Sequence, residues 1–291
     1  MNVSVWIFFI ALLFINAAQT QAETYVDQAG RQITLASRPQ RIISLMPSVT
    51  EIIFDLGAGE RLKGVTMYSN EPPVAAQLPK VGSYVHLDLE KIISLRPDLC
   101  LAVRDGNPIH IIDKITALAI PVFTVDPRNL EEIMESIKML GQVLQAEDKA
   151  EKITREMKRR IATAEKNVPK GKRPAVFFQI DAAPIISAGS NTFIDQLITR
   201  AGGMNLAAGS TPYPRYSWED ILLMQPEIVL IASMAGGHSP EELKASWMKW
   251  PRIPAVKNKN IYVVDASLFD RPTARLVDGL EMLMQIFKNS R

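Results

Sequence analysis

Short apolar runs rich in β-branched residues alternate with amphipathic helical patterns as far as Asp126. The apolar runs read RIISL, KGVTM, DLCLAV and PVFTVD, and helical periodicity covers Val49–Leu56, Leu89–Leu95 and Ile109–Ala119. Alternation of this kind favours a parallel sheet with helices on its faces. The pattern therefore predicts an α/β lobe in the first part of the chain.

The pattern changes between Leu130 and Asn167. This stretch has no proline and a single glycine, Gly141, and it mixes Glu and Lys with Ile, Met and Leu at helical spacing. It predicts a single long spine helix with Gly141 as the place where it would bend. Apolar runs then resume as RPAVFFQI, PIISA, IVLIAS and IYVVD, and a final helix is expected near Ala274–Phe287. The order predicts two similar α/β lobes with central, mostly parallel sheets, joined by that helix.

The first residues suggest export. Val5–Ala18 is apolar and uncharged, and it is shorter than the roughly 20 residues that span a bilayer. The small and polar stretch after it indicates a secretory signal peptide cut after Ala22, with an uncleaved membrane anchor as the alternative. We expect residues 1–22 to be the signal peptide, 23–128 the N-terminal lobe, 129–168 the interlobe helix and 169–291 the C-terminal lobe.

Cysteine content and charge restrict the expected location and partners of the protein. Cys100 is the only cysteine, which excludes an internal disulfide and a lipid-anchoring cysteine beside the cleavage site. A free periplasmic protein is therefore expected. The net charge is +2 with both signs interspersed, so no nucleic-acid partner is indicated.

One sequence pattern occurs twice in the chain. LEKIISLRPDLCLA begins at Leu89 and WEDILLMQPEIVLI at Trp218, and each carries a glutamate, Glu90 or Glu219, at its second position. Asp88 and Ser217 are interpreted as helix N-caps, Ser217 within a capping box closed by Asp220. An acid in the first helical turn gains about 0.3–1 kcal/mol from the helix dipole, so either glutamate alone needs no further role.

A second pair of segments extends the repetition. RIISLMPSVTEIIFDLGAG and PIISAGSNTFIDQLITRAGG each predict a strand, a polar loop, an amphipathic helix and a glycine stop. Two similar lobes would face each other across a cleft, with ligands at the carboxyl ends of the strands. The cleft loops are then expected at Met46–Ser48, Tyr68–Pro73, Arg104–Pro108, Asp181–Pro184 and Ser267–Pro272.

From Arg41 onward the chain resembles the periplasmic substrate-binding proteins of ATP-binding-cassette importers for cobalamin, iron-siderophores and haem. The segments that carry the resemblance are RIISLMPSVTEIIFDLGAG, YSNEPP, LDLEKIISLRPDL, VRDGNP and STPYPRYSWEDI, and the likeness is greatest to the cobalamin branch. It implies a monomer that captures a corrinoid in the interlobe cleft, without catalysis or cofactor, and docks on an inner-membrane permease dimer. Haem or a ferric siderophore is the alternative ligand.

The resemblance also implies roles for residues. Tyr68 and the stretch Ser267–Arg271 fall on ligand contacts, Tyr84 and Tyr213 stand where a cobalamin binder has tryptophans, and Glu90 and Glu219 fall on permease-docking positions. Two features depart from the pattern: Val103 and Leu268 replace large aromatics, and the disulfide of the second lobe is missing.

A corrin is a broad apolar disc with an amide-bearing rim, so its receptor needs flat faces and a few donors. Tyr68, Tyr84, Tyr213 and Phe269 could supply faces, while Arg104, Asn107 and Arg271 could supply donors. The full set of expected ligand-binding residues is Tyr68, Tyr84, Arg104, Asn107, Tyr213, Ser267, Leu268, Phe269, Asp270 and Arg271. Any one of the tyrosines could equally be structural, and RDGNP alone is an ordinary turn.

Other chemistries find less support. His86, His110 and His238 are too few for a convincing zinc site, so no metal is expected. Tyr84 could bind ferric haem as a tyrosinate. GAGERLKG ends a helix and does not follow a strand, which argues against a dinucleotide motif. With no nucleophile motif in the chain, an exported enzyme is the remaining alternative of a different class.

Overall fold

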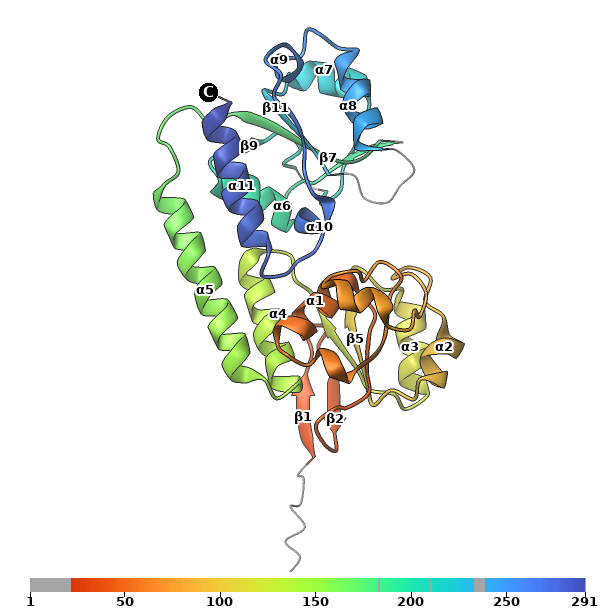
Figure 1. Ribbon diagram of the computed structural model, residues 1–291. Helices are drawn as coiled ribbons and strands as arrows, with labels where there is room; N and C mark the ends of the chain where they lie inside the picture. The colour runs from red at the N-terminus through yellow and green to blue at the C-terminus, as the bar shows by residue number, and fades with distance from the viewer. Residues whose placement is uncertain (1–21, 183, 210, 233–238, 291) are drawn as a thin grey trace, which may run out of the picture.

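The computed structural model describes residues 22–182, 184–209, 211–232 and 239–290, which form two α/β lobes (Figure 1). Apart from Ala22, the expected signal peptide lies outside these residues. No helix among them is long and apolar enough to cross a membrane.

The first lobe contains a four-stranded parallel sheet in the order β4-β3-β5-β6. Each strand is one of the expected apolar runs, and all five residues of β5 are buried. The strands are β3 (Ile42–Ser44), β4 (Leu62–Val65), β5 (Leu99–Val103) and β6 (Val122–Val125), and the helices are α1 (Pro47–Asp55), α2 (Leu89–Ser94) and α3 (Ile109–Ala117), with 3₁₀ turns η1 (Gly59–Arg61) and η2 (Pro73–Gln77). An antiparallel hairpin, β1 (Glu23–Val26) and β2 (Gln32–Leu35), precedes the sheet.

The second lobe repeats the parallel order. Its strands β7 (Ala175–Ala182), β9 (Met204–Asn205), β11 (Ile228–Ile231) and β12 (Ile261–Val263) pair as β9-β7-β11-β12, which matches β4-β3-β5-β6 position by position. Antiparallel β8 (Ile185–Ser187) and β10 (Arg215–Tyr216) extend the sheet beside the end of β7. The helices are α6 (Phe193–Arg200), α7 (Trp218–Met224), α8 (Pro240–Met248), α9 (Pro254–Lys257), α10 (Ala266–Phe269) and α11 (Leu276–Asn289).

The two IIS segments are not equivalent strands. Ile42–Ser44 is β3, a central strand of the first sheet, whereas Ile185–Ser187 is β8, the return strand of a hairpin with β7. The counterpart of β3 is β7, because β3 lies between the parallel strands β4 and β5, and β7 lies between the parallel strands β9 and β11. The repetition holds for the helices that follow, α1 and α6.

The expectation of a single spine helix is wrong. The stretch forms two helices, α4 (Leu130–Val143) and α5 (Glu147–Lys166), which pack side by side as an antiparallel hairpin. Gln145 has φ of 52° and the N–H of Ala146 donates to the carbonyl of Gly141, so the chain reverses there. A side chain at Gly141 would place its Cβ 2.5 Å from that of Ala150, so the close approach of the helices requires glycine.

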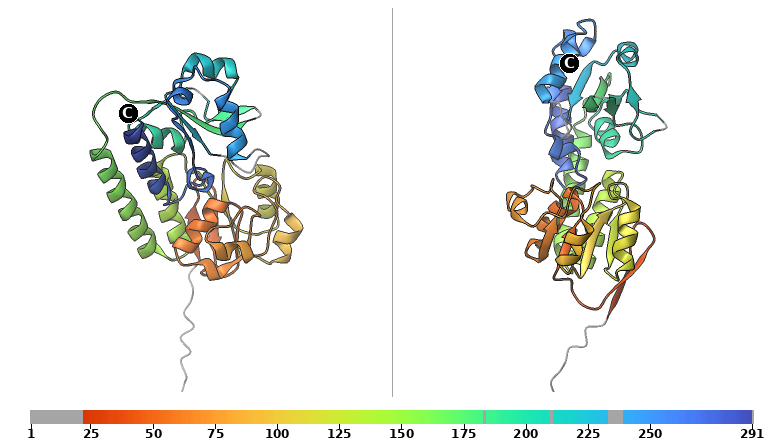
Figure 2. Two further views of the ribbon diagram at one scale, coloured as in Figure 1. Left: turned by 45° about the horizontal axis from the view of Figure 1, so that its top comes forward. Right: turned by 90° about the vertical axis from the view of Figure 1, so that its right-hand side faces the viewer.

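Helix α5 runs along one side of the molecule and passes both lobes (Figures 1 and 2). Buried residues of α4 and α5, among them Ile137, Leu140 and Ile161, belong to one apolar cluster that also contains Ile53 of the first lobe and Leu280 of the second. The two lobes therefore share a continuous core along the helical hairpin.

Candidate functional site

A cavity of about 610 Å³ lies between the lobes. In the first lobe its walls are the loops that follow β3, β4, β5 and β6. In the second they are the β7–β8 hairpin, the start of α6, the segment before β10 and the segment around α10. This is the carboxyl edge of the parallel strands, where α/β sheets bind ligands. Four of the five expected loops contribute side chains; next to the fifth, 181–184, it is Ile180 and Ile186 that line the cavity.

Six of the ten expected ligand-binding residues line this cavity. They are Tyr68, Tyr84, Tyr213, Ser267, Asp270 and Arg271. The first two come from the first lobe and the other four from the second, so only the folded arrangement of both lobes brings them together.

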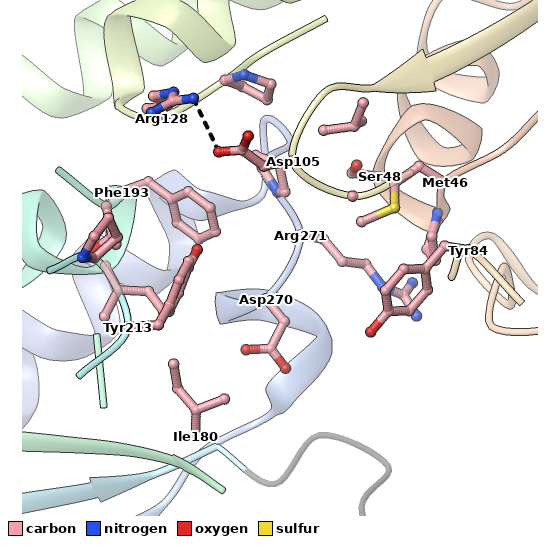
Figure 3. A pocket seen from close by; sticks show the side chains of 18 of the residues that line it. Met46, Ser48, Tyr84, Asp105, Arg128, Ile180, Phe193, Tyr213, Asp270 and Arg271 are labelled. Atoms are coloured by element: carbon pink, nitrogen blue, oxygen red, sulfur yellow. Dashed lines mark ion pairs between the residues drawn. The ribbon is translucent and has the colours of Figure 1, made fainter. Parts of the chain in front are cut away.

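Aromatic rings stand on both sides of the cavity. On one side the ring centroids of Tyr68 and Tyr84 lie 5.9 Å apart with an interplanar angle of 59°. Across from Tyr84, Figure 3 shows Tyr213 and Phe193 close together. Such a cavity can hold a broad, flat apolar ligand between its walls.

The environment of the tyrosine hydroxyls disfavours their ionised form. Burial raises the pKa of Tyr84, and the nearby Tyr68 and Asp270 raise it further. Tyr213 has 55% of its surface exposed, yet the surrounding cleft walls displace bulk water and raise its pKa, as do Asp105 and Asp270. Both tyrosines are therefore neutral donors near pH 7.

Phe269 and Leu268 were expected at the cavity, but the structure places them in the core. Phe269 is fully buried, with its ring centroid 5.7 Å from that of Phe178, and Leu268 is 6% exposed. The reason is the phase of α10, a single turn that directs these two apolar side chains inward. Its polar neighbours Ser267 and Asp270 are on the cavity wall.

Asn107 and Arg104 are also absent from the cavity lining. Asn107 is 7% exposed: its Oδ1 accepts from the N–H of Val103, and its Nδ2 donates to the carbonyls of Leu45 (2.8 Å) and Tyr84 (3.0 Å). These bonds use its side chain to hold the segment that carries Tyr84. Arg104 is largely exposed and its guanidinium lies 3.5 Å from Asp126.

Arg271 lines the cavity, but its donors serve the protein. Its guanidinium donates to Glu51 at 2.6 Å, to the carbonyl of Tyr68 at 3.0 Å and to Asn70 at 2.6 Å. Arg275 adds a second contact to Glu51 at 3.4 Å. Because Glu51 belongs to α1 and both arginines to the second lobe, these contacts form a latch between the lobes, and Arg271 also positions the loop of Tyr68.

Several cavity residues were not predicted from the sequence. Arg128 bridges two acids: its guanidinium lies 3.1 Å from Asp105 (Figure 3) and 3.2 Å from Asp126. It lies in the loop that follows β6, so the expectation that ligands bind at the carboxyl ends of strands could have found it. Phe193 and Met46 stand at the loop-to-helix junctions of α6 and α1, but nothing in their residue types distinguishes them from core residues.

Asp270 has an unusual environment. Burial raises the pKa of its carboxyl to about 7, although Arg271 opposes the shift and Asp265 adds to it. The guanidinium of Arg271 is turned to Glu51, so it compensates the neighbouring carboxylate poorly. Asp270 is therefore a cavity acid that is close to half-protonated at neutral pH.

Of the two histidines in the described part of the chain, one is at the cavity and the other on an exposed helix face. His86 lines the cavity, His110 is exposed on α3, and His238 lies outside the described residues. Within the described part of the chain no group of three or more His, Cys, Asp or Glu side chains could hold a metal ion.

Glu90 and Glu219 occupy matched positions. Each is the second residue of its helix, α2 or α7, and each is exposed. The predicted caps are confirmed: Asp88 accepts from the N–H of Lys91 at 2.9 Å, and Ser217 and Asp220 form the reciprocal capping box. Neither glutamate forms an ion pair with another described residue.

Comparisons with known proteins agree with this geometry. The sequence profile described as "Periplasmic binding protein" matches residues 42–268. A vitamin B12-binding protein of Vibrio campbellii is 30% identical over 87% of this chain and 90% of its own length. An uncharacterised ABC transporter substrate-binding lipoprotein, YvrC of Bacillus subtilis, is 31% identical over 90% of this chain and 84% of its own.

Solved structures show the same two-lobe architecture. The periplasmic vitamin B12-binding protein BtuF of Vibrio cholerae superposes with a TM-score of 0.78 at 28% identity, covering 87% of this chain and 98% of that one. The periplasmic haem-binding protein RhuT of Roseiflexus sp. RS-1 gives a TM-score of 0.77 at 27% identity, with 86% and 98% covered.

Proposed function

The chain belongs to the periplasmic binding protein family, and we propose that it captures cobalamin or a related corrinoid in the interlobe cleft and delivers it to an ATP-binding-cassette permease. In this proposal residues 23–128 and 169–291 are the two lobes, the signal peptide is removed, and the mature protein works in the periplasm. It binds its cargo without chemical turnover.

The observation that carries the proposal is the cavity itself. It lies at the carboxyl ends of both sheets, and aromatic rings from the two lobes, Tyr84 on one side and Tyr213 and Phe193 on the other, face its interior. Flat rings suit the faces of a corrin, and neutral tyrosine hydroxyls can donate to its amide rim. The vitamin B12-binding relatives support this ligand class.

Haem is the second candidate, because haem-binding proteins share the architecture. Ferric haem can be held by a tyrosinate, and Tyr84 is positioned in the cavity. Its raised pKa works against that form. We therefore favour the corrinoid, for which a neutral tyrosine suffices.

Delivery requires a surface that the permease can recognise. We propose that Glu90 and Glu219 provide it, one on each lobe, by binding arginines of the two permease subunits. Arginine–carboxylate bonds are charge-assisted and orienting, and both carboxylates are exposed.

The visible absorption spectrum of the protein isolated from its native source tests the proposal. Corrinoid, haem and ferric siderophore absorb differently, so the cargo retained through purification identifies its class. We expect corrinoid bands. A haem spectrum would instead identify the protein as a haem-binding protein, the second candidate.

A further inference from the structure

The first turn of α1 faces the cavity without the usual caps of a helix N-terminus. Its N-cap residue, Met46, makes no side-chain hydrogen bond, Pro47 has no N–H, and no acidic residue stands in the first turn. Helix geometry leaves first-turn N–H groups without intrahelical partners. None of the backbone bonds between described residues uses the N–H of Ser48 or Val49.

The hydroxyl of Ser48 is a further unpaired donor at the N-terminus of α1. Ser48 is 2% exposed and lines the cavity beside Met46 (Figure 3), and its Oγ is buried without a hydrogen-bond partner. A buried hydroxyl in this state costs folding free energy. An acceptor on a bound ligand would provide the missing hydrogen-bond partner. The ligand could reach the hydroxyl if the flexible side chain of Met46 moved aside.

Helix α6, the equivalent of α1 in the second lobe, has the side-chain cap that α1 lacks. The start of α6 faces the same cavity, but Thr192 caps it by accepting from the N–H of Asp195. Asp195 also places a negative charge in the first turn. Side chains of the protein therefore cap the N-terminus of α6, whereas the first-turn N–H groups of α1 are available to a ligand.

Three acids on the α1 side of the cavity are each paired with an arginine. Asp105 and Asp126 both contact Arg128, and Glu51, farther along α1, is held by Arg271. Each of these acids has an arginine partner. The partial positive charge of the helix N-terminus is thus available to an acceptor.

We propose that the first turn of α1, through the Ser48 hydroxyl and the N–H groups of Ser48 and Val49, binds the phosphodiester of the nucleotide loop of cobalamin. The inference rests on the proposed function and names the subsite for one ligand group. The peripheral side chains of the corrin are neutral amides, whereas the phosphodiester is anionic. A free helix N-terminus with a serine donor favours the anion.

Titration with two corrinoids tests this subsite. Cyanocobalamin carries the nucleotide loop and dicyanocobinamide lacks it. We expect Ser48→Ala to raise the Kd for cyanocobalamin roughly tenfold or more, with little change for dicyanocobinamide. Ser187→Ala is the matched control, because Ser187 also buries an unpaired hydroxyl but does not line the cavity; both of its Kd values should equal those of the wild type.

Thermal unfolding of each variant shows that the fold is intact, since removal of an unpaired hydroxyl should not lower Tm. Ser48→Cys, which replaces the hydroxyl by a somewhat larger group that donates weakly, is a second variant with the same expected pattern. An unchanged Kd for cyanocobalamin in both Ser48 variants, or an equal loss for both corrinoids, overturns the inference and leaves the proposed function standing. A wild-type protein that binds neither corrinoid refutes the proposed function, and the inference with it.

Discussion

Asp270 couples the cavity to pH. Its carboxyl has a pKa of about 7 in the folded protein because burial penalises the charged form, against an ordinary value near 4 in the unfolded chain. Between these values the folded state keeps a proton that the unfolded state has released. Stability contributed by this group therefore falls as pH rises from about 4 to about 7.

Asp270→Asn should remove that dependence. We expect the Tm of the variant, relative to wild type, to be higher at pH 8 than at pH 5, because the wild type loses stability over this interval and the amide does not. Differential scanning calorimetry at several pH values measures the difference. Asp148→Asn, at an exposed position in the first turn of α5, is the control, and parallel pH profiles for wild type and Asp270→Asn would contradict the assignment.

Family resemblance and residue chemistry together located part of the cavity. Tyr68, Tyr84 and Tyr213 stand at positions that the resemblance marks for ligand contact, and their aromatic rings suit a flat ligand. Phe269 has the same chemistry, but the phase of a one-turn helix directs it into the core. Asn107 is polar and near the cavity, yet its hydrogen bonds are internal, and bonds of this kind depend on neighbours that are distant in sequence.

At the scale of elements, α1 is joined to the segment between α10 and α11 by the latch of Glu51 with Arg271 and Arg275. The side chain of Glu51 is 5% exposed and that of Arg271 12%. Removing one partner of a buried ion pair leaves uncompensated charge and typically costs about 3–5 kcal/mol. Removing one partner of the latch is therefore expected to destabilise the folded arrangement of the lobes.

Glu51→Gln should lower the free energy of unfolding by about 3 kcal/mol. Glu156→Gln is the matched control, since Glu156 also bonds an arginine, Arg159, but on an exposed helix face, where such pairs contribute about 0–1 kcal/mol. Urea denaturation measures both. Equal small losses would show that the latch contributes no more than a surface pair.

The connection between the lobes could not be predicted from sequence periodicity. Helical spacing continues through Leu144–Ala146 without proline or glycine, so the pattern predicted one helix. The reversal depends on tertiary contacts: Gly141 packs against Ala150, and Lys138 pairs with Glu151 at 3.0 Å. Neither contact has a local signature in the chain.

At the scale of the whole molecule, the alternation of strands and helices predicted both α/β lobes, and the structure confirms them. The run PIISA marked β8 as a strand but not its antiparallel pairing with β7, and β10 was not predicted, because a strand of two residues is too short to show a period. The matching strand orders place α2 and α7 equivalently, and with them Glu90 and Glu219.

The combined variant Glu90→Ala/Glu219→Ala should abolish corrinoid uptake in cells while the purified protein keeps its ligand affinity, because both carboxylates lie outside the cavity lining. Glu241→Ala is the matched control: Glu241 is an exposed acid at the same position of α8, so its loss removes a similar helix-dipole contribution of about 0.3–1 kcal/mol. Normal uptake by the double variant would return both glutamates to that plain structural role.

Titration calorimetry of the mature chain with cyanocobalamin, haemin and a ferric hydroxamate siderophore tests the central claim most directly. We predict saturable binding of cyanocobalamin at one site per chain, and its loss in the Tyr68→Ala/Tyr84→Ala variant, which removes the aromatic face of the first lobe. Saturable binding of haemin or the siderophore, with no binding of cyanocobalamin, would contradict the account.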